Sequence, residues 1–126
     1  MSNIATTIEQ SQHLLELGLD PKIADMVWMS NKWLYSIKDN ILNKYDFNEQ
    51  DTLAWSLSAL LEVMPSEESK WCTLMHAQDF YWCTFEKSDG TILKEFCSNN
   101  YIDAAYEMVC WLVEQGLIKK GDNDED

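Results

Sequence analysis

Cysteine and histidine are the residues of this chain best suited to chemistry, because a thiolate or an imidazole can bind a metal ion or attack a substrate. The gaps between successive cysteines are 11, 14 and 13 residues. Closed zinc sites and thioredoxin-like motifs use pairs of ligands only a few residues apart. The spacing therefore favours small buried hydrophobic side chains over a metal centre. The residues concerned are His13, Cys72, His76, Cys83, Cys97 and Cys110.

Three of these side chains could still share one face of a predicted sheet. Cys72 and His76 are four residues apart on a predicted strand, so both point the same way. The expected pairing places Cys97 opposite Trp82, and Trp82 opposite Leu74, which brings Cys97 onto that face. Cys83 is expected on the opposite face of the sheet, and Cys110 is expected on a helix. A four-ligand site cannot assemble from this arrangement, so we predict no metal ligand and no cofactor-binding residue.

No catalytic motif accompanies these residues. The sequence contains no GxSxG nucleophile elbow, no P-loop and no GxGxxG fingerprint. Its 22 aspartates and glutamates make any single pair of carboxylates uninformative about acid–base work. We therefore predict no catalytic residue. An enzyme with an unrecognised site remains an alternative, and it requires a pocket that holds His76 or a cysteine with a shifted pKa.

Helices and strands must position these side chains, and local signals predict where the first helices begin. Thr7 and Gln10 have the spacing of a capping box, and Gly18 is placed to end that helix. Asp20 before Pro21 predicts the start of a short helix that runs to residue 25, because aspartate caps a helix and proline is tolerated in its first turn.

Two further helices are predicted on the C-terminal side. Apolar residues recur with helical spacing after Ser56 or Asp51, either of which could cap the helix, and Pro65 ends it. The last helix begins after Asn100, whose side chain can cap the first turn, and ends at Gly116.

Strand-forming residues occupy two regions of the chain. Residues 26–38 predict a hairpin that turns near Ser30, and residues 71–76, 80–87 and 91–97 predict a three-stranded meander.

The turn between the last two predicted strands has the clearest signal. Asp89 followed by Gly90 predicts a type I′ turn. A turn centred on these two residues pairs Cys83 with Phe96, and it pairs the neighbouring residues in the same register.

The predicted fold class is α+β, with a mostly antiparallel sheet packed by three main helices. The sheet consists of the C-terminal three-stranded meander plus a possible N-terminal hairpin. Residues 40–50 are polar and predict an irregular loop. We expect residues 1–120 to form a single domain and residues 121–126 to form an acidic disordered tail.

Three stretches of the chain carry a resemblance when taken together. They are EQSQHLLELGLDPKIADM, AWSLSALLEVMP and IDAAYEMVCWLVEQGLI. The chain resembles a group of small proteins, without assigned activity, that are common in gut anaerobes, their phages and integrated mobile elements. The resemblance covers most of the chain and implies an origin in a phage or mobile element and a cytosolic life. This chain departs from that group at Tyr101, where relatives commonly have proline.

The charge of the chain excludes several classes of partner. The formal net charge is −13, and all nine basic residues are lysines. Binding of phosphates and reading of guanine depend on lysine and above all on arginine, so we predict no direct nucleic-acid binding. The same charge disfavours anionic membrane surfaces. The N-terminus shows no secretory signal, and a cytoplasmic location is therefore expected.

Both faces of the predicted meander are apolar. One expected face carries Trp71, Met75 and Cys83, and the other carries Leu74 and Trp82. A single C-terminal helix can cover only one face. The N-terminal half of the chain or a partner must therefore cover the other.

These observations predict a small, acidic, non-enzymatic interaction protein, an accessory factor of a phage or mobile element. It would act through contacts with a partner protein or with a second copy of itself. Trp28, Trp33 and Trp55 are predicted to be exposed partner-binding residues, because they lie in the least regular part of the sequence. An acidic nucleic-acid mimic that inhibits a host defence enzyme is an alternative, which requires carboxylates aligned at phosphate-like spacing.

Overall fold

Three α-helices, one 3₁₀ turn and six strands form the part of the chain that the computed structural model describes, residues 4–37 and 49–118. The predicted α+β class is thereby confirmed. The predicted loop at 40–50 lies largely outside the described residues, and the tail at 121–126 lies entirely outside them. In chain order the elements are α1 (Ile8–Leu17), η1 (Pro21–Ile23), β1 (Met26–Met29), β2 (Trp33–Ser36), β3 (Thr52–Ala54), α3 (Leu57–Val63), β4 (Lys70–Ala77), β5 (Phe80–Lys87), β6 (Ile92–Ser98) and α4 (Tyr101–Glu114).

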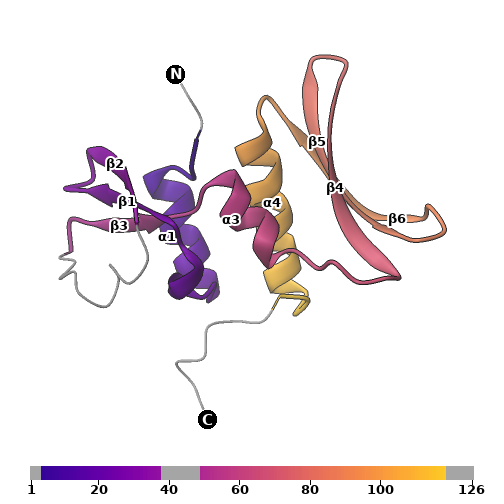
Figure 1. The fold of residues 1–126 in the computed structure, drawn as a ribbon, viewed down its shortest axis with the longest axis horizontal. Coiled ribbons are helices and arrows are strands. Elements are labelled where there is room, and N and C mark those ends of the chain that lie inside the picture. Colours follow the sequence, from indigo (N-terminus) through magenta and orange to yellow (C-terminus); the bar gives the residue numbers. More distant parts are fainter. Residues whose placement is uncertain (1–3, 38–48, 119–126) are drawn as a thin grey trace, which may run out of the picture.

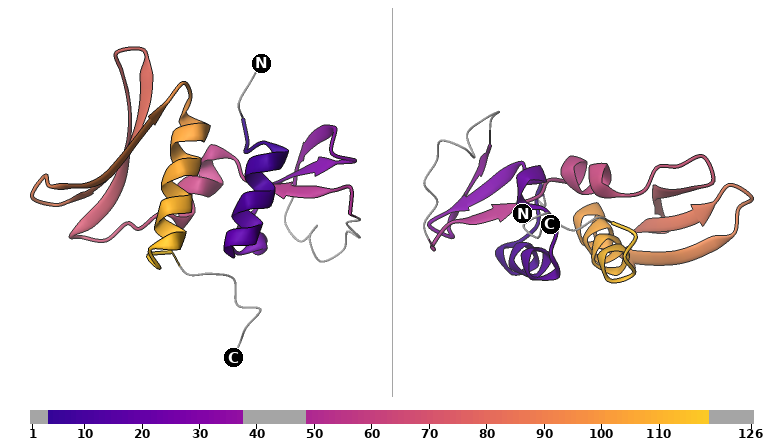
Figure 2. Two further views of the ribbon diagram at one scale, coloured as in Figure 1. Left: turned by 180° about the vertical axis from the view of Figure 1, so that it is seen from behind. Right: turned by 90° about the horizontal axis from the view of Figure 1, so that it is seen from below.

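The helices lie between two separate antiparallel sheets (Figure 1). The N-terminal sheet has the strand order β2-β1-β3, and the C-terminal sheet has the order β4-β5-β6. Figure 2 shows α1 and α4 side by side, with the N-terminal sheet beyond α1 and the C-terminal sheet beyond α4. The predicted hairpin and meander are both present. The sequence does not predict β3, which pairs with β1 and gives the hairpin a third strand.

The longer helices begin and end where their capping residues predict. Thr7 and Gln10 each accept the backbone N–H of the other at 3.0 Å, which is the reciprocal arrangement of a capping box. Asn100 caps α4 by accepting a backbone N–H from its first turn at 2.8 Å. Gly18 and Gly116 close the C-terminal ends with φ values of 102° and 75°, a conformation that glycine adopts without a Cβ clash.

The short helix predicted from Asp20 to residue 25 is a single 3₁₀ turn. The Asp20 side chain caps it by accepting the N–H of Lys22 at 3.0 Å. The turn ends early, and the Asp25 carboxylate instead accepts the backbone N–H of Ser56 at 2.8 Å and also its hydroxyl. Ser56 in turn caps α3, so this contact joins the N-terminal segment to the start of that helix.

The two turns of the C-terminal sheet differ in type. Gln78 and Asp79 form a two-residue turn between β4 and β5 with φ values of 56° and 68°, as in a type I′ turn. The type I′ turn predicted at Asp89 and Gly90 is wrong, because only Gly90 has a positive φ, 93°. Its N–H donates to the Lys87 carbonyl at 2.9 Å, which gives a type I turn followed by a glycine bulge.

The register of the C-terminal sheet is correct on one side and wrong on the other. Trp82 lies opposite Cys97, and Cys83 lies opposite Phe96, as predicted; an irregularity near the β5–β6 turn restores this register. Between β4 and β5 the prediction is wrong by one residue, because Leu74 lies opposite Cys83 and not opposite Trp82. Successive side chains alternate between faces, so this shift changes which residues of β4 and β5 share a face.

A hydrophobic core runs through the helices and joins the two halves of the described chain. Met108 and Leu112 of α4 are fully buried in it, together with Leu14 of α1 and Leu60 of α3. Phe85 enters the same core from the C-terminal sheet. The side of that sheet that faces α4 is called the inner face below, and the opposite side is called the outer face. None of the described helices is long and apolar enough to cross a membrane.

Candidate functional site

The structure separates the three tryptophans that were predicted to bind a partner. Trp33 exposes 62% of its surface and lies on β2, an edge strand of the sheet formed by the described residues. Trp28 on β1 is half-buried and donates its indole N–H to the Thr6 carbonyl at 3.0 Å. Trp55 is fully buried in the core between β3 and α3, so the expectation that it is exposed is wrong. The local sequence pattern does not predict this burial, because Trp55 belongs to a core that includes residues of the distant helices α1 and α4.

Trp33 is positioned by a tight turn between β1 and β2. Ser30 and Asn31 have φ values of 55° and 51°, so both central residues of the turn are left-handed, as a type I′ turn requires. Side chains at the start of β3, which pairs with β1 beside this turn, hold them. Asp51 accepts the Ser30 backbone N–H at 2.9 Å, and Thr52 donates to the Asn31 side chain at 2.7 Å. These bonds offset the cost of left-handed backbone at non-glycine residues.

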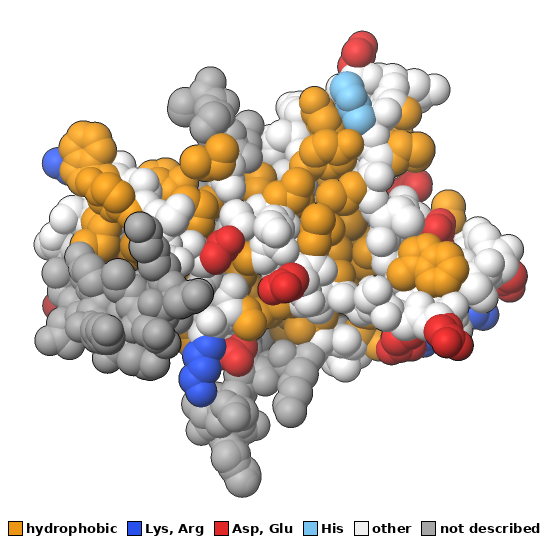
Figure 3. Space-filling view, viewed as in Figure 1, with side chains coloured by type: hydrophobic (Ala, Val, Ile, Leu, Met, Phe, Trp, Pro, Cys, Tyr) orange, Lys and Arg blue, Asp and Glu red, His pale blue; other side chains and the backbone are white. Residues whose placement is uncertain are grey.

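Tyr35 adds a second exposed ring beside Trp33. It lies two residues further along β2, so it points to the same side of the strand. It exposes 55% of its surface. We call Trp33 and Tyr35 the aromatic hairpin surface; Figure 3 shows apolar side chains gathered over this hairpin at the upper left. Trp33 was predicted from the sequence and Tyr35 was not, although their two-residue spacing indicated a shared side of the strand.

The cysteines and His76 do not form the predicted group on one face. Cys72 and His76 lie on the inner face, whereas Cys97 lies on the outer face beside Trp82. The expectation for Cys83 is also wrong, because this residue shares the inner face with Cys72. Both errors follow from the one-residue shift between β4 and β5. Within residues 4–37 and 49–118, no three metal-ligating side chains are placed to hold a metal ion.

Cys72 and Cys83 contact each other under α4. The hydrogen bond between the two thiols raises the pKa of Cys83, and burial raises it further. The same bond lowers the pKa of Cys72, against the effect of its own partial burial. Both thiols are free, and Cys83 is fully buried. A neutral, inaccessible thiol is a packing residue, so Cys83 is no nucleophile in this fold.

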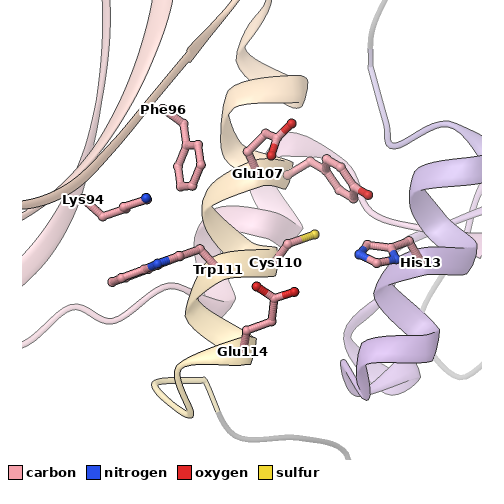
Figure 4. A pocket seen from close by; sticks show the side chains of 8 residues that line it. His13, Lys94, Phe96, Glu107, Cys110, Trp111 and Glu114 are labelled. Atoms are coloured by element: carbon pink, nitrogen blue, oxygen red, sulfur yellow. The ribbon is translucent and has the colours of Figure 1, made fainter.

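A groove of about 340 Å³ lies beside α4, between α1 and β6. Figure 4 shows Cys110 pointing across it toward His13 of α1, while Trp111 and Lys94 lie on the side of the sheet. The Lys94 ammonium lies over the Trp111 ring, 5.8 Å from its centroid. This groove was not predicted from the sequence. Its lining residues on α4 recur with helical spacing, namely Tyr106, Glu107, Cys110, Trp111 and Glu114.

The groove does not hold an activated nucleophile. Burial raises the pKa of Cys110 to about 11, against the lowering effect of a hydrogen bond with Tyr106. Burial also raises the pKa of Tyr106 above its usual value. Both groups are therefore protonated and neutral near pH 7. His76 lies elsewhere, with its ring stacked on Tyr81 at a centroid distance of 4.3 Å. The pocket that an unrecognised enzyme site requires is thus present, but the raised pKa of Cys110 makes its thiol less reactive.

The acidic residues on one face of the described structure are scattered. On the face drawn in Figure 3, carboxylates occur singly or in small groups between apolar patches, and they do not form a continuous row. A nucleic-acid mimic needs such a row, because phosphates follow one another at regular intervals along a strand.

No family model, no curated protein and no solved structure matches this chain. A functional assignment therefore depends on the chemistry of the described surfaces.

Proposed function

We propose that this protein is a non-enzymatic interaction protein that acts through protein–protein contacts, as an accessory factor of a phage or mobile element in the cytoplasm of its host. The aromatic hairpin surface carries this proposal, because Trp33 and Tyr35 expose 62% and 55% of their surfaces side by side on one strand. Tyrosine and tryptophan are the residues most enriched at the energetic centres of interfaces. The origin in a phage or mobile element rests on the sequence resemblance.

The position of these rings on an edge strand supports the same function. β2 has a hydrogen-bonded neighbour, β1, on one side within the described sheet. An edge strand offers backbone N–H and C=O groups to an incoming chain, and the side chains that alternate along it give specificity. A partner that adds a strand to β2 would cover Trp33 and Tyr35 with its own side chains.

The groove on α4 lacks an activated nucleophile. Its thiol, Cys110, has a pKa of about 11 and stays protonated at neutral pH. The surrounding charges are mixed, with Lys94 on one wall and Glu107 and Glu114 along α4. We therefore place the function on the aromatic hairpin surface and not in this groove.

The proposal is tested by comparing two variants in a quantitative pull-down from a lysate of the cell that carries the gene. Trp33→Ser combined with Tyr35→Ser removes the aromatic hairpin surface. Ile4→Ser combined with Leu61→Ser removes exposed apolar side chains elsewhere and serves as the matched control. We expect a protein captured by the wild-type chain to be lost with the first variant and retained with the second. Circular dichroism must show that both variants are folded.

Two results would count against this function. One is a strictly monomeric protein, by size-exclusion chromatography with light scattering, that retains no protein from the lysate. The other is a captured protein that both variants retain equally, which would remove the aromatic hairpin surface from the interaction.

A further inference from the structure

The outer face of the C-terminal sheet is a second surface that the rest of the described chain leaves open. α4 packs on the inner face, and the N-terminal elements lie on the far side of α4 (Figures 1 and 2). Met75 and Ile92 on the outer face expose 52% and 54% of their surfaces. Trp71 and Trp82 are half-buried beside them. The described residues of the N-terminal half therefore do not cover this face.

The register of the strands sorts the charges of this sheet by sign. Lys70 lies opposite Lys87, and Lys94 lies opposite Phe85, so all three lysines of the strands project from the inner face. The glutamates of the strands project from the other side. Their positions are Glu86, opposite Trp71, and Glu95, opposite Thr84.

The two glutamates are held in place but keep their charge available. The Trp71 indole N–H donates to Glu86 at 3.2 Å, and the Thr84 hydroxyl donates to Glu95 at 3.1 Å. An ionised carboxylate can accept about four hydrogen bonds, so each retains acceptor capacity. Within the described residues, neither glutamate forms an ion pair with a cationic side chain. The outer face is thus apolar and anionic at once.

The combination of apolar and anionic groups determines which kind of partner can bind the outer face. A second copy of the chain would bring a net charge of −13 and the same two glutamates, which would repel those of the first copy. An apolar segment without charge would bury both carboxylates without a cationic partner, which is costly. A segment with lysine or arginine beside leucine, methionine or aromatic residues satisfies both the apolar and the anionic groups.

We propose that the outer face of the β4-β5-β6 sheet binds a cationic amphipathic segment of a partner protein. Trp71, Met75, Trp82 and Ile92 contact its apolar stripe, and Glu86 and Glu95 accept hydrogen bonds from its lysine or arginine side chains. This inference rests on the proposed function, because it names the chemistry of the partner of an interaction protein.

The test uses the full chain and a designed helical peptide of about four turns with leucines on one side and lysines on the other. The peptide is titrated into the ¹⁵N-labelled protein, and the indole N–H resonances are followed by NMR after assignment through single Trp→Phe variants. We expect the resonances of Trp71 and Trp82 to shift and that of Trp33 to stay in place. A peptide with glutamates in place of the lysines should cause no shift.

Two charge variants separate local recognition from the general field of an acidic protein. Glu86→Gln with Glu95→Gln removes the carboxylates of the outer face, and we expect the Kd for the lysine peptide to rise by about fivefold or more. Glu16→Gln with Glu62→Gln makes the same change in net charge at exposed helix positions. For this control we expect the Kd to stay within about twofold of the wild-type value.

Several outcomes would overturn the proposal. Equal weakening by both charge variants would mean that only long-range attraction acts, and no binding of the lysine peptide would remove the site. Shifts confined to Trp33 would move binding to the aromatic hairpin surface and leave the proposed function standing. A dimer in light scattering that Met75→Lys dissociates would show that a second copy covers this face.

Discussion

Met75 lies directly opposite Trp82 on the outer face of the C-terminal sheet, while its neighbour Leu74 lies opposite Cys83 on the inner face. Leu74 and Cys83 pack into the core under α4, whereas Met75 exposes half of its surface. A single pairing between two strands thus divides the apolar residues of this sheet into those that stabilise the fold and those that are available for contact with a partner.

Burial predicts opposite consequences for two of the tryptophans. Trp55→Ala should reduce the free energy of unfolding by about 3–5 kcal/mol, because it leaves a large cavity in a fully buried site. Trp33→Ala removes an exposed ring and should change it by no more than about 0.5 kcal/mol. Urea unfolding followed by circular dichroism measures both values. A small loss in the free energy of unfolding for Trp55→Ala would contradict the position of Trp55 in the core.

A buried hydroxyl pair should contribute measurably to stability. Thr6 accepts the Trp55 backbone N–H at 3.0 Å, and its hydroxyl lies 2.7 Å from that of Ser11. Ser11 donates to the Thr7 carbonyl, so Thr6 is the donor within the pair. Thr6→Val leaves the Trp55 N–H without its acceptor and removes the hydrogen bond that the Ser11 hydroxyl accepts, so it should cost about 1–3 kcal/mol in thermal or urea unfolding. Thr→Val at an exposed strand position, Thr73, is the control, and a comparable loss there would refute this account.

The pKa of Cys110 predicts a specific pH dependence of stability. Its folded pKa of about 11 lies above the ordinary thiol value of 9.0, so between these values the unfolded chain loses a proton that the folded chain retains. The contribution of Cys110 to the free energy of unfolding is fully present below about pH 9, and it is lost as the pH rises toward 11. Urea unfolding of wild type and Cys110→Ala across this range should show a steeper decline for the wild type. Parallel curves would exclude this contribution.

The turn between β4 and β5 offers a route to a more stable protein. Asp79 has a φ of 68°, which is strained for a residue with a side chain. Asp79→Gly removes the strain and should raise the free energy of unfolding by about 1 kcal/mol. Asp89→Gly makes the same chemical change in the other turn, where φ is not positive. This control should not stabilise the protein, and an equal gain from both substitutions would show that strain is not the cause.

The local features of the fold could be predicted because they depend on neighbouring residues. Thr7 and Gln10 satisfy each other within one helical turn, and Gly18 ends that helix through its own conformational freedom. The β5–β6 pairing could be predicted for a similar reason, since a short connection limits the possible registers. Even there, the turn type was wrong and the irregularity beside it restored the pairing.

The β4–β5 register and the burial of Trp55 could not be predicted from neighbouring residues. Gln78 and Asp79 lack the glycine that typically marks a type I′ turn, so the sequence contains no strong signal for the two-residue turn that aligns Ala77 with Phe80. Trp55 lies in a segment without clear periodicity, and it belongs to a core that includes residues of α1 and α4.

Composition and short-range signals alone therefore determine the α+β class, the ends of the main helices, the strands of the meander and the net charge of −13. The three-dimensional arrangement determines which aromatic rings remain exposed and which charges share a face with them. The physical reason is the two-residue period of a strand: a shift of one position exchanges the inner and outer faces, and contacts with α4, distant in the sequence from β4, select between them.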